Sequence, residues 1–139
     1  MENKLKHLDF IQNIITRMNT NSFLIKGWTI TLVAALFALA AKDSDKNFII
    51  IGLFPTMIFW FLDAFYLRKE RLFRCLYDEV RNVEESKIDF NMRTGKFKSN
   101  KEVKFPKVFI SKSIFSFYIS ILIIIVVIIF YLNCWKGYC

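Results

Sequence analysis

The chain has 139 residues, of which 55% are hydrophobic and sixteen are Phe, and its mean hydropathy is +0.35. A soluble domain of this length cannot bury so much apolar surface, because small folds bury only about two-thirds of what the unfolded chain exposes. The net charge of +8 is concentrated in residues 93–112, which carry seven basic side chains and one acidic side chain. Composition therefore excludes an ordinary soluble domain and predicts a single unit in a lipid bilayer. The basic segment suits anionic lipid, nucleic acid or an acidic protein.

Residues 1–21 predict an amphipathic helix. Its apolar side chains recur at intervals of three or four and are Leu5, Leu8, Ile11, Ile15 and Met18. The segment is too polar to cross a bilayer, so it either lies in the headgroup layer or packs against another cytoplasmic helix. Asn21 and Ser22 are favourable N-cap residues, and we expect a new helix to begin there.

Two apolar segments, residues 22–41 and 47–67, predict a transmembrane hairpin joined by a short turn without net charge. Lys26 lies one turn into the first span, where its long side chain reaches the interface. Pro55 removes one helical hydrogen bond from the second span and predicts a bend near mid-membrane. One face of the first span is small enough for close helix packing and consists of Thr31, Ala35 and Ala38.

Residues 68–112 predict a basic cytoplasmic helix followed by a loop. No helix breaker follows the second span, so we expect its helix to leave the bilayer and to continue to about Glu85 or Ser86. The helical pattern fails at residues 87–106, where a small hairpin and a basic loop fit the sequence equally well.

Residues 113–133 predict a third span, uncharged and rich in Ile, and residues 134–139 form a short outer tail. Basic residues flank the spans on one side, so the positive-inside rule places the N-terminus in the cytoplasm and the C-terminus outside. Cys134 and Cys139 either form a disulfide, if the outer compartment is oxidising, or stay free thiols. The predicted fold is an all-α membrane protein with three transmembrane helices, an amphipathic N-terminal helix, and a second span that continues into a cytoplasmic helix.

The sequence offers no enzyme site, and we expect neither catalytic residues nor a metal or cofactor. His7 is the only histidine, so triads based on histidine and zinc sites with several imidazoles lack the necessary parts. Gly-Lys-Ser/Thr phosphate loops and Gly-x-Gly-x-x-Gly are also missing from the sequence. His7 itself is interpreted as a solvated helix residue.

Three polar residues are candidates for a pore or its mouth. Asp63 lies within the second span, where an ionisable side chain is costly. It contributes either to an acidic ring at a channel mouth or to an interfacial salt bridge with Lys26, Arg68 or another subunit. Ser116 and Ser120 share one face of the third span. They either line a wet path or donate to carbonyls of their own helix.

Five cations on the continuation of the second span are candidates for binding an anionic ligand such as an oligonucleotide, mostly through its phosphates. They are Arg68, Lys69, Arg71, Arg74 and Arg81. The alternative is ordinary charge next to a membrane span, which sets topology while Asp78, Glu84 and Glu85 pair within the chain.

Three segments carry a resemblance to a known group of proteins: NSFLIKGW (residues 21–28), LVAALFALAA (residues 32–41) and FLDAFYLRKERLFR (residues 61–74). They resemble small bacterial membrane effectors of phage-defence operons, the SLATT-like channel proteins and the Hailong channel subunit among them. The resemblance covers about residues 1–81. It implies a homo-oligomeric pore in the bacterial inner membrane that depolarises the infected cell under a nucleotide-derived signal made by a partner nucleotidyltransferase.

The functional expectation is therefore an oligomeric channel gated at its basic cytoplasmic mouth by an anionic nucleotide or oligonucleotide. The alternative is a non-conducting membrane anchor or accessory subunit that binds a soluble partner or acidic lipid through the basic cytoplasmic segment.

Overall fold

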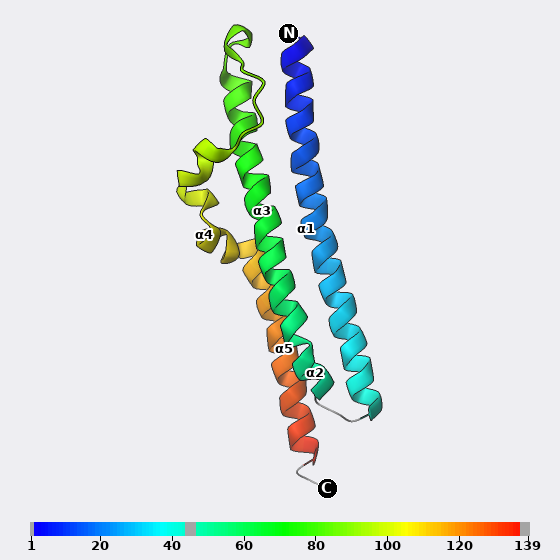
Figure 1. Ribbon diagram of the computed structural model, residues 1–139. Coiled ribbons are helices and arrows are strands. Elements are labelled where there is room, and N and C mark those ends of the chain that lie inside the picture. The colour runs from blue at the N-terminus through cyan, green and yellow to red at the C-terminus, as the bar shows by residue number, and fades with distance from the viewer. Residues whose placement is uncertain (1, 44–46, 137–139) are drawn as a thin grey trace.

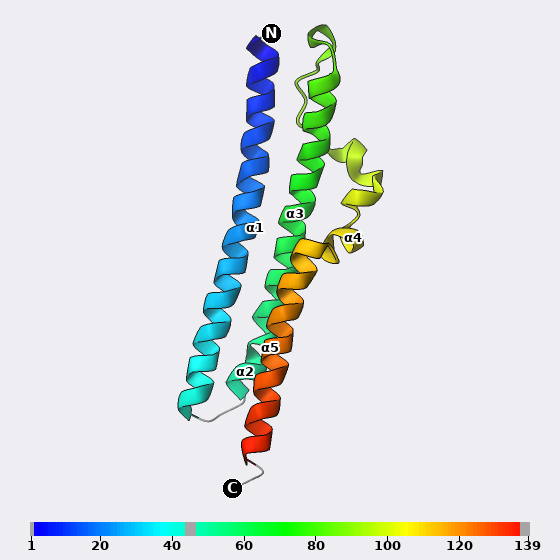
Figure 2. The ribbon, with the colours of Figure 1, turned by 180° about the vertical axis from the view of Figure 1, so that it is seen from behind.

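Three long helical segments run side by side through a computed structural model that describes residues 2–43 and 47–136 (Figure 1). α1 (Glu2–Asp43) descends from the N-terminus, α3 (Leu53–Asn82) returns antiparallel to it, and α5 (Lys112–Lys136) descends again beside α3. The N-terminus and the C-terminus therefore lie at opposite ends, as the reverse view also shows (Figure 2). The predicted all-helical fold with three helical segments long and apolar enough to cross a membrane is confirmed.

α1 is one continuous helix of 42 residues, so the expectation that Asn21 and Ser22 cap a new helix is wrong. Ser22 is 7% exposed and points its hydroxyl at α3 instead. The segment contains no proline, and one glycine in a helix interior, Gly27, costs only about 1 kcal/mol relative to alanine. At 1.5 Å per residue α1 is roughly 63 Å long, about twice the thickness of a hydrocarbon core.

The second apolar segment is broken at Gly52 into α2 (Asn47–Ile51) and α3. The helix is interrupted as expected, but at Gly52, three residues before Pro55. Pro55 has no N–H to donate to the Ile51 carbonyl, four residues earlier, and its ring crowds that carbonyl, so the preceding turn cannot stay regular. Thr56 restores part of the pattern, since its N–H and its hydroxyl both donate to the Gly52 carbonyl, at 3.3 and 2.8 Å. A Cβ on Gly52 would meet the Leu36 side chain of α1 at 3.2 Å. The absence of a side chain at Gly52 therefore lets α1 pass close to this point of the chain.

α3 ends at Asn82, short of the end expected at residues 85–86. A lysine from the start of α1 closes this end: Lys4 Nζ donates to the carbonyl oxygens of Arg81, at 3.0 Å, and Val83, at 2.6 Å. The last carbonyls of a helix have no partner within the helix and carry a partial negative charge, so a cation suits them. This contact, the Lys4 clamp, ties the two helices together at the N-terminal end of the molecule.

The connection from α3 to α5 contains no strand within the part of the chain that the structure describes. Of the two alternatives the basic loop is therefore right and the hairpin is wrong. The connection consists of three short 3₁₀ turns and one short helix: η1 (Glu85–Lys87), η2 (Gly95–Ser99), η3 (Lys101–Val103) and α4 (Phe105–Phe109). Phe90 between the first two turns has φ 52°, a value uncommon for a bulky residue.

Three clusters of buried apolar side chains hold the helices together. The upper cluster, near the N-terminus in Figure 1, joins α1 to α3 and consists of Ile11, Ile15, Leu76 and Val80. The middle cluster joins α3 to α5 and consists of Trp60, Ala64, Ile114 and Tyr118. The lower cluster joins α1, α2 and α5 and consists of Val33, Ala40, Ile49, Ile121 and Ile125.

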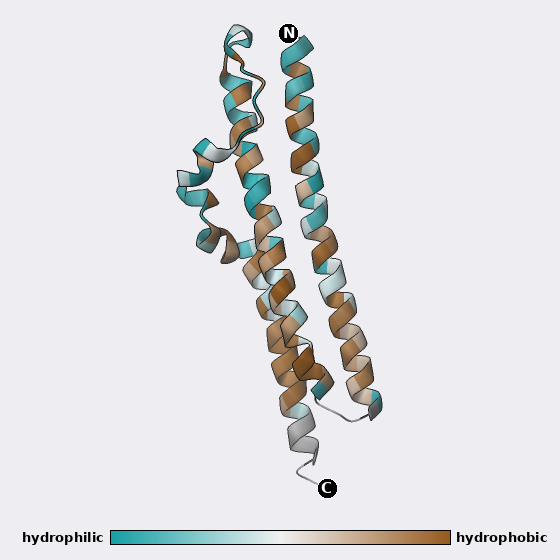
Figure 3. Cartoon of the chain, in the orientation of Figure 1, coloured by the Kyte–Doolittle hydropathy of each residue, from teal (hydrophilic) through white to brown (hydrophobic). Residues whose placement is uncertain are grey.

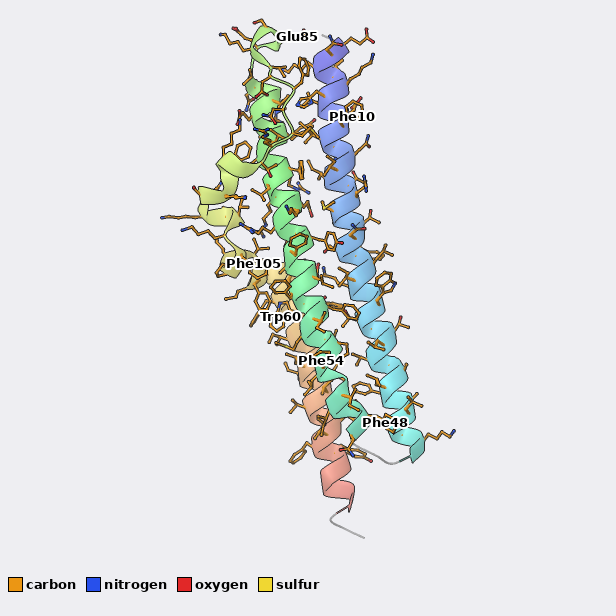
Figure 4. All side chains as sticks on the ribbon, viewed as in Figure 1. Phe10, Phe48, Phe54, Trp60, Glu85 and Phe105 are labelled. Carbon is orange, nitrogen blue, oxygen red and sulfur yellow. The ribbon has the colours of Figure 1, made fainter. Side chains whose placement is uncertain are left out.

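Trp60 lies where α3, α4 and α5 meet (Figure 4). Its ring stacks on Phe109, at 4.6 Å between centroids, and on Tyr118, at 5.6 Å. Its indole Nε1 donates to the Phe109 carbonyl at 3.2 Å. A buried indole of this kind holds neighbouring elements together, because its faces supply a large packing area and its N–H donates an oriented hydrogen bond. Trp60 thus fixes the point at which the chain enters α5.

Apolar residues cover the lower part of the molecule and polar residues the upper part (Figure 3). Large aromatic side chains stay exposed in the apolar part, including Phe23 at 75%, Phe54 at 73% and Phe130 at 69%. Exposed apolar surface of this extent marks contact with lipid or with another protein. The distribution is that of a membrane protein with a polar extension on one side.

Candidate functional site

A buried polar cluster joins α1 to α3 at the boundary between the polar and apolar parts. Asp63 is fully buried, and Lys26 Nζ lies 2.6 Å from its Oδ2. The Ser22 hydroxyl donates to Asp63 Oδ1, and Lys26 Nζ also donates to the Ser22 oxygen at 2.9 Å. These three residues form what we call the polar centre. Each charge has a partner, which is what makes ionised groups tolerable inside a low-dielectric interior.

Sequence reasoning had left Asp63 with two roles, and the structure shows the salt bridge with Lys26. The carboxylate is 0% exposed within this chain, so it presents no acidic surface at a channel mouth here. Ser22 was missed as its partner. The spacing of Ser22 and Lys26, four residues apart on a helix, places both on one face and is the signal that could have found it.

A groove runs between α1 and α5 below the polar centre, and we call it the α1–α5 groove. Its volume is about 770 Å³. Lys26, Val33 and Phe37 line the α1 side, and Lys26 Nζ lies 6.0 Å from the centre of the Phe117 ring on the opposite wall. α3 lies between the two helices in both views (Figure 2). The groove lies beside the lower cluster, in which Val33 of α1 and Ile121 of α5 pack together, and both residues also line its wall.

Ser116 and Ser120 line the α5 wall of the groove and are exposed. Each hydroxyl donates to the carbonyl four residues earlier, of Lys112 and of Ser116, both at 2.7 Å. The second alternative from the sequence, back-bonding within the helix, is therefore confirmed. The hydroxyl oxygens keep their lone pairs and face the groove, so the wall can still accept hydrogen bonds from water.

The five predicted ligand-binding cations do not form one open patch. Arg68 Nε donates to the Val103 carbonyl at 3.0 Å, and Arg71 Nη1 donates to the Glu102 carbonyl at 2.9 Å. Both arginines therefore hold η3 against α3. A short 3₁₀ turn leaves carbonyls unpaired, and guanidinium donors satisfy them.

The other three cations also have partners within the chain. Arg74 pairs with Glu70 at 2.7 Å, Arg81 lies 3.8 Å from Asp78, and Lys69 lies over the Phe65 ring at 5.5 Å. Arg74 and Arg81 keep 61% of their side chains exposed. The alternative of internally paired charge thus describes most of this helix.

The basic connection, unlike α3, contains exposed cations that form no ion pair within the described residues. Lys98, Lys101 and Lys104 are exposed, and within the described residues none of their ammonium groups has a carboxylate partner. Lys107 instead pairs with Glu102, and this hydrogen bond holds the pKa of the exposed Glu102 carboxyl below its usual value. Of α3 and the connection, it is therefore the connection that leaves cationic surface available.

His7 is 5% exposed, so its interpretation as a solvated residue is wrong. The imidazole packs edge-on against the Phe90 ring, with 5.5 Å between ring centroids. Its Nε2 is buried and has no hydrogen-bond partner among the residues that the structure describes. The sequence could not show this burial, because Phe90 reaches His7 from a connection without regular structure.

Within the described residues no three His, Cys, Asp or Glu side chains gather in a way that could hold a metal ion. The fold defines the class: an all-helical protein in which three helical segments are long and apolar enough to cross a membrane. No family model, curated protein or solved structure matches the chain. The predictions for Cys134 and Cys139 lie outside the side chains that the structure describes.

Proposed function

We propose that this chain is the subunit of a homo-oligomeric channel in the bacterial inner membrane, controlled at its cytoplasmic end by an anionic nucleotide or oligonucleotide in anti-phage defence. The N-terminus and residues 68–112 lie in the cytoplasm and the C-terminus lies outside, as the distribution of basic residues predicts. A partner nucleotidyltransferase makes the signal.

The observation that carries the channel proposal is the α1–α5 groove. Its wall bears Lys26, Ser116 and Ser120 on the stretches of α1 and α5 whose other exposed side chains are mostly apolar. Polar groups that face hydrocarbon are costly, and in membrane proteins they usually face the interior of an assembly or a water-filled cavity. Three helices of one chain do not enclose an aqueous path, so several copies must place these walls around a common axis.

The small face of α1 supports assembly. Thr31, Ala35 and Ala38 are exposed within the single chain. Small residues let membrane helices approach closely, and dispersion and weak polar contacts then hold them together. The neighbouring subunit is the natural partner for this face.

Cysteine accessibility tests the proposal directly. In a chain whose native cysteines are replaced by serine, Ser120→Cys should react with a charged, water-soluble thiosulfonate during conduction in planar bilayers, and the current should fall. Val127→Cys, on an exposed α5 position outside the groove, is the matched control and should stay unmodified. Reaction at Val127→Cys but not at Ser120→Cys would show that water reaches the face of α5 outside the groove and not the groove itself, and would contradict the channel proposal.

Topology and assembly have their own readouts. Ser99→Cys should be labelled only after cells are permeabilised, because residue 99 lies in the predicted cytoplasmic segment. The mass of the detergent-solubilised protein should correspond to several copies, and Ala38→Leu should shrink or scatter that assembly, since overpacking a close contact costs about 1–3 kcal/mol per site. A monomeric wild type would exclude a pore.

The exposed lysines favour a second candidate function, a non-conducting anchor that binds acidic lipid. Lys98, Lys101 and Lys104 follow one another at intervals of three on the connection. Each lysine near an anionic surface contributes about 1 kcal/mol to binding. With the protein held in nanodiscs of neutral lipid, replacing all three by Gln should abolish its binding to vesicles rich in phosphatidylserine only if this second function is right.

A further inference from the structure

A cavity of about 660 Å³ opens beside the upper part of α1, at the end proposed to be cytoplasmic. The side chains that matter are Lys6, His7, Phe10, Asn13, Arg17 and Phe90. The five from α1 are spaced by one, three or four residues and lie on one helical face, and Phe90 comes from the connection after α3. We call this cavity the α1 pocket. It is separate from the five cations of α3 and from the α1–α5 groove.

Two aromatic rings form apolar walls of the pocket. Phe10 is 63% exposed (Figure 4) and Phe90 is 47% exposed. The upper part of the molecule, to which Phe10 belongs, is largely polar (Figure 3). Phe90 holds its position with φ 52°, a conformation that disfavours bulky side chains. Strain of this kind persists at sites where the side chain has a use. Exposed rings at a polar surface provide faces on which a planar group can stack.

The same pocket contains unmatched polar capacity. His7 lines it and is 5% exposed, and its buried Nε2 has no hydrogen-bond partner within the described part of the chain. A buried polar atom without a hydrogen bond is unfavourable, so a group that supplies one gains free energy. Phe90 packs edge-on against the imidazole, with 5.5 Å between ring centroids, and both rings line the pocket.

Charge in the pocket is positive. Arg17 has no ion pair among the described residues, and Lys6 pairs with Glu2 only in an exposed contact, with side chains 63% and 80% exposed. An exposed pair of this kind contributes little and exchanges readily for a better anion. None of the described residues that line the pocket carries a carboxylate. Two cations beside two stacking faces match a ligand that joins phosphate to a planar base.

We propose that the α1 pocket binds a nucleotide, or the terminal nucleotide of an oligonucleotide. The base stacks on Phe10 and Phe90, its polar edge reaches His7, and its phosphates contact Arg17 and Lys6. This inference rests on the proposed control by a nucleotide signal and gives that signal a site. α1 continues without a break from the pocket to Lys26 in the α1–α5 groove, so a ligand that holds the upper part of α1 acts on the helix that lines the groove.

Calorimetry on the whole protein in lipid nanodiscs tests the site with four probes: ATP, adenosine, inorganic tripolyphosphate and a short DNA oligonucleotide. ATP or the oligonucleotide should bind. Adenosine lacks the phosphates and tripolyphosphate lacks the base, so each should bind at least about tenfold more weakly than ATP. Comparing ATP with the oligonucleotide shows which of the two sources of the same chemistry fits the pocket.

Two substitutions and two matched controls locate the site. Arg17→Gln and Phe10→Leu should each weaken binding by roughly tenfold, the effect of one charge-assisted hydrogen bond or one stacked base. Lys87→Gln removes a charge from the same end of the molecule, and Phe23→Leu removes an exposed ring from the same helix outside the pocket. Both controls should bind like wild type with unchanged oligomer size.

Several outcomes would overturn the inference. Tripolyphosphate binding as tightly as ATP would mean a basic surface only. Wild-type affinity in Arg17→Gln together with lost binding in Arg71→Gln/Arg74→Gln would move the site to α3. A change of oligomer size in Phe10→Leu would make the pocket a contact between subunits. Conductance is a separate readout. A wild-type protein that conducts but binds none of the four probes would contradict the proposed pocket and leave the channel proposal standing. A wild-type protein that binds ATP but does not conduct would contradict the channel proposal alone.

Discussion

The upper and lower parts of α1 have the same spacing of buried residues on the face that packs against the other helices. They differ in the side chains on the opposite, exposed face. In the upper part, residues 2–21, the buried positions are His7, Ile11 and Ile15, four residues apart. In the lower part, residues 22–43, Ile25, Thr29 and Val33 continue the same spacing, but side chains such as Ile30 and Leu39 are exposed as well. The buried face therefore determines how α1 packs in both parts. The exposed face determines the surroundings that each part suits, which are water for the upper part and an apolar environment for the lower part.

The two parts are also closed differently. The connection covers the upper cluster, because Met92 and Phe97 pack onto it. Among the residues that the structure describes, no irregular connection covers the lower part in this way, and the α1–α5 groove is open beside it. Cohesion in the upper part therefore comes from burial of apolar side chains. At the start of the lower part it comes from the polar centre, where α1 and α3 are joined by charge.

Breaking the polar centre should have the largest effect on this comparison. Lys26→Met leaves the Asp63 carboxylate buried without its cation, and removing one partner of a buried ion pair costs about 3–5 kcal/mol. Reversible unfolding in mixed micelles with sodium dodecyl sulfate measures the loss. Combining Lys26→Met with Asp63→Leu should recover most of it, because no unpaired charge is left. A single variant as stable as wild type would show that the pair contributes nothing.

The next comparison places one isoleucine in each part. Ile11→Ala removes a side chain that is 0% exposed and should lower the free energy of unfolding by about 2–5 kcal/mol. Ile30→Ala removes a side chain that is 54% exposed and should change stability by no more than about 0.5 kcal/mol. The same unfolding assay applies to both. Equal losses would mean that a subunit contact buries Ile30 in the solubilised protein.

A smaller effect should follow from opening the Lys4 clamp. Lys4→Met removes the cation from the two carbonyls at the end of α3 and should cost about 1 kcal/mol. Lys6→Met, two residues away, removes only an exposed pair with Glu2 and should stay within about 0.5 kcal/mol of wild type. Hydrogen exchange at the last turn of α3 gives a local readout. Unchanged exchange in Lys4→Met would show that this end of α3 closes without the lysine.

These contacts show where sequence reasoning succeeds and where it stops. The three apolar segments were predictable because hydropathy over about twenty residues is a local property. The continuity of α1 was not, because capping by Asn21 and Ser22 is only a local preference, and the Asp63 carboxylate that Ser22 contacts lies 41 residues away. Tertiary contact overrode the local signal.

The candidate site followed the same division. Lys26 was predictable as the partner of Asp63, since the two spans had to lie together. The partners of Arg68 and Arg71 were not, because they depend on how an irregular connection lies against α3. His7 and Phe90 meet for the same reason and were equally hidden. The helical segments and the pairing of neighbouring spans could therefore be predicted from the sequence. The contacts made by the irregular connection could not.

The smallest expected effect concerns Cys75, which reports the packing of the upper part. Burial, and then the nearby Asp78 carboxylate, raise the pKa of this thiol. A raised pKa means less thiolate at pH 8, so alkylation by iodoacetamide should be slower than in the unfolded chain. Asp78→Asn removes the second cause, lowers the pKa and should speed alkylation by less than about tenfold, the effect of one pKa unit.

Mass spectrometry of a chain with Cys134→Ser and Cys139→Ser follows this one thiol. Identical rates in the folded and unfolded chain would mean that the upper part opens freely and that its packing does not persist in solution.

The Lys4 clamp also has a consequence for the order of biogenesis. Lys4 leaves the ribosome 77 and 79 residues before the two carbonyls that it binds. α1 ends only four positions before α2 begins, so we expect pairing of α1 with the returning chain to begin at these two helix ends, where closing the loop costs the least entropy. We then expect the helices to pair progressively toward the N-terminus and the Lys4 clamp to form last. By the same logic it opens first, which makes the start of α1 the fraying end of the hairpin.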